Sequence, residues 1–189
     1  CIRDSLKSLL SDLNHTSQKG LQTIFDSSVG RSTVNHPIGG CYQITPTEAS
    51  VQKLPVEHGK TETVSVMAQG YNPYVAAWSP YHGAAYAVIE ATARLVAAGS
   101  DWSKARFSYQ EYFERMDKQA ERFGQPVSAL LGSIEAQIQL GLPSIGGKDS
   151  MSGTFEELTV PPTLVAFGVT TSTAGRILSP EFKAVSYTH

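Results

Sequence analysis

The residues best suited to binding a ligand form one unbroken run in a glycine- and serine-rich stretch: Gly146, Gly147, Lys148, Asp149 and Ser150. The two glycines let the backbone turn tightly and present N–H groups to an anion. The lysine adds a positive charge and the serine adds a hydroxyl, so the run suits a phosphate group. It is not a Walker A loop, because Leu142 stands where that motif needs its first glycine. An ordinary surface turn with one solvated lysine fits the same residue types.

Glu90 is a second candidate, in the middle of an alanine-rich stretch and four residues before Arg94. On a helix this spacing places both side chains on one face, where they form an ion pair worth about 0.2–0.5 kcal/mol. The functional interpretation is a carboxylate that faces a metal-bound nucleotide. The residue types alone favour the ion pair.

The sequence lacks the patterns of several other chemistries. None of the five histidines has a cysteine or histidine partner at zinc-ligand spacing, and no Gly-x-Ser-x-Gly nucleophile motif occurs. His36 stands alone, as a surface or packing histidine does. Cys1 and Cys41 are the only cysteines, and neither has an evident histidine partner. We therefore predict no catalytic residue in this chain.

The composition fits one globular domain, or one domain with part of a neighbour. The 189 residues are 41% hydrophobic and 17% charged, so the chain can bury a core. A formal net charge of -2 gives no electrostatic reason to expect nucleic acid as a partner. No apolar run reaches the roughly 18 residues of a membrane helix, and no signal peptide is visible. We expect a cytoplasmic protein with reduced thiols and no membrane contact.

In the first half of the chain, leucines at three- and four-residue steps predict a helix over residues 4–20. Residues 21–40 are expected to be irregular. Strands are predicted over 41–54 and 61–69, the second because Val64, Val66 and Ala68 alternate with Ser65 and Met67, which suits a sheet packed on one side.

Three helices are predicted in the second half. The first runs from Tyr81 to Ala98 behind a Ser79 cap, and its many small residues imply close packing on a sheet. The second begins at Ser108, where Glu111 completes a capping box. The third runs from near Pro126 to Gly141. Its apolar face is formed by Val127, Leu130, Leu131, Ile134 and Ile138.

The chain then continues as a glycine- and serine-rich loop over residues 142–155 and a buried strand over 160–172. Strands followed by helices and a closing strand indicate an α+β fold, a mixed β-sheet with helices packed on one face.

Three stretches of the sequence carry a family resemblance. They are Tyr71-Asn72-Pro73 with Ser79-Pro80-Tyr81, the residues 87–99 with 107–113, and the residues 146–155 with 160–164. In this order and spacing they resemble large, single-chain phosphoribosylformylglycinamidine synthases over essentially the whole chain. The resemblance implies a domain like the N-terminal one of aminoimidazole ribonucleotide (AIR) synthetase, in the second of two ATP-binding copies.

By this resemblance the whole enzyme is an ATP-dependent carbon–nitrogen ligase of purine biosynthesis, with ATP and magnesium as cofactors. It converts formylglycinamide ribonucleotide, ATP and glutamine to formylglycinamidine ribonucleotide. The family's catalytic histidine motif lies in the first copy and is not found here, so we expect the chain alone to be inactive. Its implied partners are the remaining synthetase and glutaminase domains and small-molecule substrates. The family's two ATP-binding copies pair through their sheets, so we expect this chain alone to self-associate.

The resemblance also implies a division of the chain. Residues 1–40 are expected to be a linker helix and an irregular segment, residues 41–175 the ATP-binding-type domain, and residues 176–189 the start of a following domain. Both ends look cut, which indicates a piece of a longer polypeptide.

The family pattern assigns roles to individual residues. The run Gly146–Ser150 matches its phosphate-binding segment, Glu90 matches the helix carboxylate of a magnesium–nucleotide site, and Glu48 stands where the preceding strand carries an aspartate. Arg94 departs from the pattern, which has an asparagine ligand there, because a guanidinium offers a positive charge and no oxygen. We expect Arg94 to neutralise Glu90 and to leave this chain without metal or nucleotide. The alternative is that Arg94 binds an anion together with the Gly146–Lys148 segment.

Two other interpretations stay open. One is a structural unit of the same enzyme with no ligand of its own. The other is a different ATP-dependent relative such as AIR synthetase itself, against which the run Gly-Gly-Lys-Asp-Ser-Met-Ser argues.

Overall fold

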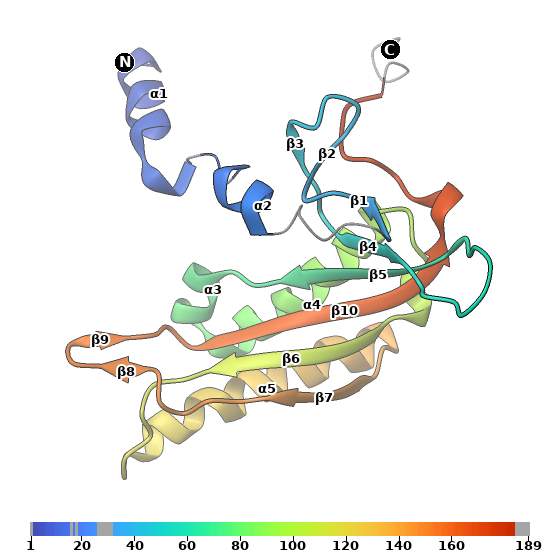
Figure 1. Ribbon diagram of the computed structural model, residues 1–189. Coiled ribbons are helices and arrows are strands. Elements are labelled where there is room, and N and C mark those ends of the chain that lie inside the picture. Colours follow the sequence, from blue (N-terminus) through green and yellow to red (C-terminus); the bar gives the residue numbers. More distant parts are fainter. Residues whose placement is uncertain (1, 16, 18, 26–31, 184–189) are drawn as a thin grey trace.

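The centre of the molecule is a six-stranded β-sheet in the computed structural model, which describes residues 2–15, 17, 19–25 and 32–183 (Figure 1). Across the sheet the strands are β1 (Thr33–Asn35), β4 (Ser50–Lys53), β5 (Thr63–Gly70), β10 (Thr163–Thr173), β6 (Arg106–Tyr112) and β7 (Ser144–Lys148). Neighbouring strands pair antiparallel except β6 and β7, which run parallel. The predicted mixed sheet is confirmed.

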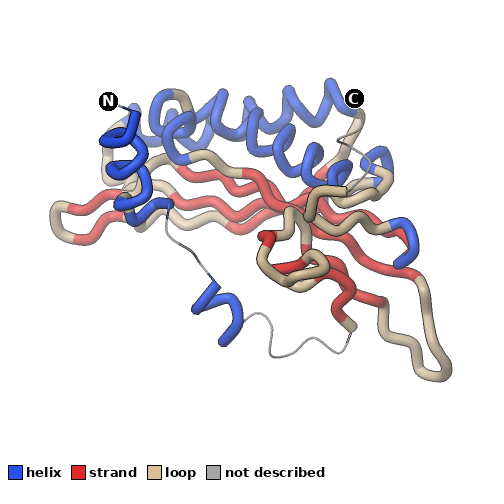
Figure 2. The backbone as a smooth tube through the Cα atoms, turned by 90° about the horizontal axis from the view of Figure 1, so that it is seen from above, coloured by secondary structure: helices blue, strands red, loops and turns tan. Residues whose placement is uncertain are grey.

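Two helices lie side by side on one face of this sheet, α4 (Pro80–Ala97) and α5 (Ala120–Leu140) (Figures 1 and 2). The short helix α3 (Pro73–Trp78) joins β5 to α4, and α5 connects the parallel strands β6 and β7. The predicted arrangement of helices on one face is therefore also confirmed. None of the helices in the described part of the chain is long and apolar enough to cross a membrane.

The remaining elements are short. Before the sheet come α1 (Ile2–Ser11), the 3₁₀ helix η1 (Leu13–His15) and α2 (Lys19–Phe25). Two hairpins and two further 3₁₀ helices complete the fold: β2 (Ile38–Gly39) with β3 (Thr45–Pro46), β8 (Thr154–Phe155) with β9 (Leu158–Thr159), η2 (Trp102–Lys104) and η3 (Ala174–Arg176).

Alternation along the strands separates a covered face of the sheet from an open one. In β5, Val64, Val66 and Ala68 are buried beneath the helices, whereas Met67 between them is exposed. Val169 of β10 lies opposite Met67 and is exposed on the same side. A strand directs successive side chains to opposite faces, so these residues mark a sheet face that α4 and α5 leave open.

Glycine and alanine bring the helices close to the sheet and to each other. A Cβ atom added at Gly70 in β5 would lie 2.1 Å from the carbonyl oxygen of Ala87 in α4. One added at Gly132 in α5 would lie 2.0 Å from the carbonyl oxygen of Tyr81 in α4. The close packing predicted from the small residues of α4 is confirmed, and α5 shares it.

The prediction of a helix beginning at Ser108 is wrong, because Arg106–Tyr112 form β6. Phe107, Tyr109 and Glu111 are buried in alternation, which is the period of a strand. β6 pairs with β10 on one side and β7 on the other. Long-range pairing with two neighbouring strands overrides the local capping-box match.

The third predicted helix exists, but it begins at Ala120 and contains Pro126. Its buried residues are small ones: Pro126, Ala129, Gly132, Ser133 and Ala136. The larger apolar residues predicted to form its packed face, from Val127 to Ile138, are instead between 41% and 69% exposed. Close approach to α4 admits only small side chains, so the large ones point outward.

Three predicted segments in the first half also differ from the structure. The helix expected over residues 4–20 is divided into α1, η1 and the start of α2. The segment expected to be irregular, 21–40, contains β1 and β2, with residues 26–31 outside the described part. Within 41–54 only β3 and β4 are strands. Of the segment predicted to open a following domain, residues 184–189 also lie outside the described part.

In the second half, the loop expected over 142–155 contains the edge strand β7 and the short strand β8. The predicted strand over 160–172 is confirmed as β10. The same holds for the strand predicted over 61–69, which is β5, and for the helix predicted from Tyr81 to Ala98, which is α4 with its Ser79 cap.

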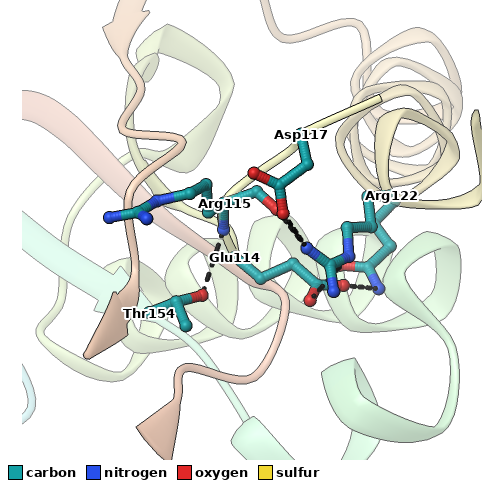
Figure 3. A network of polar contacts seen from close by, with 6 residues as sticks. Glu114, Arg115, Asp117, Arg122 and Thr154 are labelled. Carbon is teal, nitrogen blue, oxygen red and sulfur yellow. Dashed lines mark hydrogen bonds and ion pairs between the residues drawn. The ribbon is translucent and has the colours of Figure 1, made fainter. Parts of the chain in front are cut away.

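Arg122 fixes the connection between β6 and α5 (Figure 3). Its guanidinium lies 3.2 Å from a Glu114 carboxylate oxygen, donates to Asp117 Oδ2 at 2.7 Å, and donates to the carbonyl oxygen of Arg115 at 2.8 Å. The amide of Arg115 in turn donates to Thr154 Oγ1 at 3.1 Å. One side chain in the first turn of α5 therefore holds the loop that leads out of the sheet.

Candidate functional site

Arg94 lies between two carboxylates in the structure. Its Nη2 donates to Glu90 Oε1 at 2.7 Å, and its Nε lies 3.2 Å from Glu48 Oε2. The second oxygen of Glu90 accepts a hydrogen bond from the amide of Tyr71 at 2.9 Å. The expected pairing of Arg94 with Glu90 is present, and Glu48 joins it.

This arrangement does not fit magnesium. Magnesium takes oxygen ligands in near-octahedral geometry, whereas the guanidinium supplies no oxygen and a positive charge of its own. Both oxygens of Glu90 are already hydrogen-bonded, one to Arg94 and one to the Tyr71 amide. Among the described residues no group of three or more His, Cys, Asp or Glu side chains could hold a metal ion. Arg94 thus supplies to Glu90 and Glu48 the positive charge that a bound cation would otherwise supply.

Arg94 and Glu48 border a cavity of about 330 Å³ beside the edge of the sheet. Met67 and Phe167 contribute apolar surface from the open face. Most of the other side chains around it carry amide or hydroxyl groups: Gln22, Thr33, Asn35, Thr47, Ser50, Gln52 and Gln69. These groups can hydrogen-bond a neutral polar molecule, but none of them pairs a nucleophile with a general base. The cavity is therefore suited to binding a polar molecule.

The Gly146–Ser150 run is not a free loop, because its first three residues form the end of β7. Gly146, Gly147 and Lys148 pair with Ser108, Tyr109 and Gln110 of β6. As β7 is the last strand of the sheet, the backbone groups on its outer side have no strand partner within the sheet.

Side-chain contacts also hold this run in place. The side-chain amide of Gln110 donates to the carbonyl oxygen of Lys148 at 3.0 Å. Lys148 Nζ lies 5.9 Å from the ring centroid of Tyr112, within cation–π range. The amide of Ser150 donates to the Glu111 carbonyl oxygen at 3.0 Å, and the Phe113 amide donates to the Ser150 carbonyl oxygen at 2.9 Å. The Lys148 charge is thus directed along the end of β6.

Two carboxylates meet where this run leaves β7. Glu111 is 6% exposed, and Asp149 is exposed nearby. Burial raises the pKa of Glu111, and the negative charge of Asp149 raises it further. Negative charges thus repel one another beside Asp149. An anion bound by the Gly146–Ser150 run would have to depend on the Lys148 charge and on the backbone amides.

The structure separates the two candidate places. Glu48 precedes β4 and Lys148 ends β7, and β5, β10 and β6 lie between these strands. At about 4.8 Å for each of four strand spacings, β4 and β7 are roughly 19 Å apart. The alternative in which Arg94 binds an anion together with the Gly146–Lys148 segment is not supported by this arrangement.

Sequence reasoning missed Tyr71 and the cavity-lining glutamines. The Tyr71 amide holds Glu90, and its hydroxyl lies 2.9 Å from Thr163 Oγ1 at the start of β10. Gln52 and Gln69 lie on neighbouring strands of the sheet. The glutamines could have been found from the sequence, because they alternate with apolar residues along predicted strands. The contact made by the Tyr71 backbone amide leaves no pattern in the sequence.

The comparisons with solved structures agree on the fold of this chain, whereas the comparisons of its sequence find no match. No family model and no curated protein matches the sequence. Among solved structures, PurLQS from Thermotoga maritima matches 88% of this chain with a TM-score of 0.70 and 17% identity. PurL of the same organism complexed with AMPPCP matches 90%, with a TM-score of 0.70 and 17% identity. The chain has the fold of one part of PurL. It spans only about a quarter of those proteins, 25% and 27% of their chains.

A more distant match extends the fold to a second group. AaThiL complexed with AMPPCP and TMP matches 86% of this chain and 44% of its own, with a TM-score of 0.51 and 12% identity. The PurL and ThiL matches together confirm the predicted AIR-synthetase-like fold. They do not bear on the roles predicted for Glu90, Glu48 or the Gly146–Ser150 run, which stay predictions.

Proposed function

We propose that this chain is an ATP-binding-type unit of a phosphoribosylformylglycinamidine synthase, an ATP-dependent carbon–nitrogen ligase of purine biosynthesis. The match to PurL over 88–90% of the chain carries this proposal. Solved PurL structures carry ATP, ADP and the ligand FGAR. In the proposed reaction ATP is consumed and ADP is released. The run Gly146–Ser150 and the family-like sequence on α4 favour the large, single-chain type and its second copy.

In this proposal the chain contributes to the framework of the enzyme more than to its chemistry. The observation behind this role is the ion-paired Arg94, which stands where a magnesium ligand is expected. It favours the second candidate function, a structural unit with no ligand of its own, within the same enzyme. Residues 41–175 would be the unit itself, between a linker and the start of a following domain.

The chain alone is expected to form no amidine from formylglycinamide ribonucleotide, ATP, magnesium and ammonia. The reaction needs ATP, substrate and ammonia to be held together, and the family's catalytic histidine motif is not in this sequence. A product assay by mass spectrometry measures this directly. Adding the chain to the separately expressed remaining units of a large synthetase should restore amidine formation. Amidine formed by the chain alone, or a folded mixture that stays inactive, would contradict the proposal.

The open face of the sheet is the surface that a second unit would cover in this proposal. Met67 and Val169 lie there, exposed on central strands. We expect the isolated chain to self-associate through this face as its concentration rises. Light scattering over a concentration series should show a growing mass, and Val169→Arg should reduce that growth while leaving thermal unfolding unchanged. A strictly monomeric native chain would show that this face needs no cover.

A further inference from the structure

The N-terminal helix α1 carries an apolar stripe that no described residue covers. Its large apolar residues recur at three- and four-residue steps and extend into η1: Ile2, Leu6, Leu9, Leu10 and Leu13. They are between 48% and 88% exposed, and no residue of α1 is buried. Figure 1 shows the helix standing away from the sheet and its covering helices. A helix this short does not hold its shape through its own hydrogen bonds, so its stability depends on a partner for the leucines.

A matching surface lies on the outer side of α5. Its large apolar residues also follow three- and four-residue steps and are at least 41% exposed: Phe123, Val127, Leu130, Leu131, Ile134 and Ile138. On the neighbouring helix α4, Tyr86, Ile89 and Val96 are exposed as well. Between Phe123 and Leu140 the only charged residue is Glu135. An apolar surface of this extent on a helix layer is typical of a binding interface.

We propose that α1 of one copy packs on the outer face of α5 in a second copy of this chain. The lengths are compatible: the ten residues of α1 span about 15 Å, and the α5 stripe from Phe123 to Ile138 spans about 24 Å, which is long enough to seat all of α1. Their flanking charges are complementary, because Arg3 and Lys7 adjoin the leucine stripe and Glu135 adjoins the α5 stripe. Each copy has both surfaces, so a reciprocal exchange closes as a two-fold dimer.

The position of α2 favours a second copy over docking within one chain. Gln22 of α2 borders the cavity together with Met67 and Phe167, whose side chains belong to the open face of the sheet. The α5 stripe lies on the opposite side, on the helix layer. Helix α1 itself lies beyond the β1 side of the sheet (Figure 1), whereas α5 connects β6 and β7 at the opposite edge, so the surface that fits α1 lies at the far side of its own domain.

Cross-linking between two differently tagged chains tests this proposal. One chain carries Leu9→Cys and the other carries Ile134→Cys, both with Cys1→Ser, Cys41→Ser and Val169→Arg so that native thiols and the open sheet face play no part. Under mild oxidation the mixed dimer should form at least about ten times faster than with Ser8→Cys, which lies off the stripe of α1. Equal rates for Leu9→Cys and Ser8→Cys would overturn the proposal.

Sedimentation of the Val169→Arg chain gives a second, independent readout. We expect a dimer that becomes a monomer with Leu131→Glu, a substitution at a half-exposed position that leaves the core intact. If the Val169→Arg chain is already a monomer, or if Leu9→Cys and Ile134→Cys placed in one chain link only within that chain, the exchange between copies is wrong. Neither result affects the proposed synthetase function, which the activity assay tests separately.

Discussion

Replacing Gly132 with alanine is expected to lower the free energy of unfolding by about 2–4 kcal/mol. The new Cβ atom would lie 2.0 Å from the carbonyl oxygen of Tyr81, and backbone cannot move aside as the end of a side chain can. Relief requires α5 to move away from α4, which opens the packing of both helices on the sheet. Thermal or urea unfolding of the native and variant chains measures the loss.

Gly124→Ala in the same helix is the matched control. A Cβ atom at Gly124 meets nothing within 4 Å, so the same substitution should be neutral or should stabilise the chain by about 0.5–1 kcal/mol. Equal effects at the two positions would mean that helix propensity, and not the contact with Tyr81, determines the result. The account of close helix packing would then be wrong.

Replacing Arg94 with asparagine is expected to create magnesium-dependent ADP binding at least about tenfold tighter than in the native chain. The substitution removes the guanidinium from Glu90 and Glu48 and puts a carbonyl oxygen one helical turn from Glu90. Loss of the partly exposed ion pairs should cost only about 0–1 kcal/mol of stability, so the variant stays folded. Isothermal titration with ADP, with and without magnesium, measures the gain.

Arg94→Lys provides the control for charge. Lysine keeps a positive group at the same place and offers no oxygen, so it should gain no magnesium-dependent binding. If Arg94→Lys gains as much as Arg94→Asn, the asparagine oxygen is not what creates the binding. If neither variant gains binding, Arg94 is not what keeps a metal from Glu90.

Much of the fold could be predicted because local and long-range requirements agree there. In β5 the alternation of Val64, Val66 and Ala68 with Ser65 and Met67 matches its position under α4, and Ser79 caps α4 as its sequence predicts. The helix predicted at Ser108 was wrong because its signal was local, whereas β6 is defined by pairing with β10 and β7. A local sequence pattern at Ser108 does not indicate that this segment pairs with β10 and β7.

The outward face of α5 shows a different limit. The residues from Val127 to Ile138 form a regular apolar stripe, and such a stripe normally marks the buried side of a helix. Here Gly132 and its small neighbours are buried instead, because α4 comes too close for larger side chains. Periodicity identified the stripe correctly, but it does not reveal whether the stripe faces the chain's own core or another molecule.

The candidate site was predictable only in part. The spacing of Glu90 and Arg94 on one helix predicted their ion pair, and the structure contains it. The contact between Arg94 and Glu48 joins residues far apart in the sequence and was not predicted, because the family resemblance only placed Glu48 at the same metal site as Glu90. The distance between Glu48 and the Gly146–Ser150 run follows from the strand order, which the sequence pattern does not encode.

The central claim is that Arg94 takes the place of a metal in this unit, and titration of the native chain with ADP tests it most directly. With magnesium present, the heat of binding should be the same as without it, because Glu90 and Glu48 are already occupied by the guanidinium. Tight binding of ADP that requires magnesium would contradict the claim.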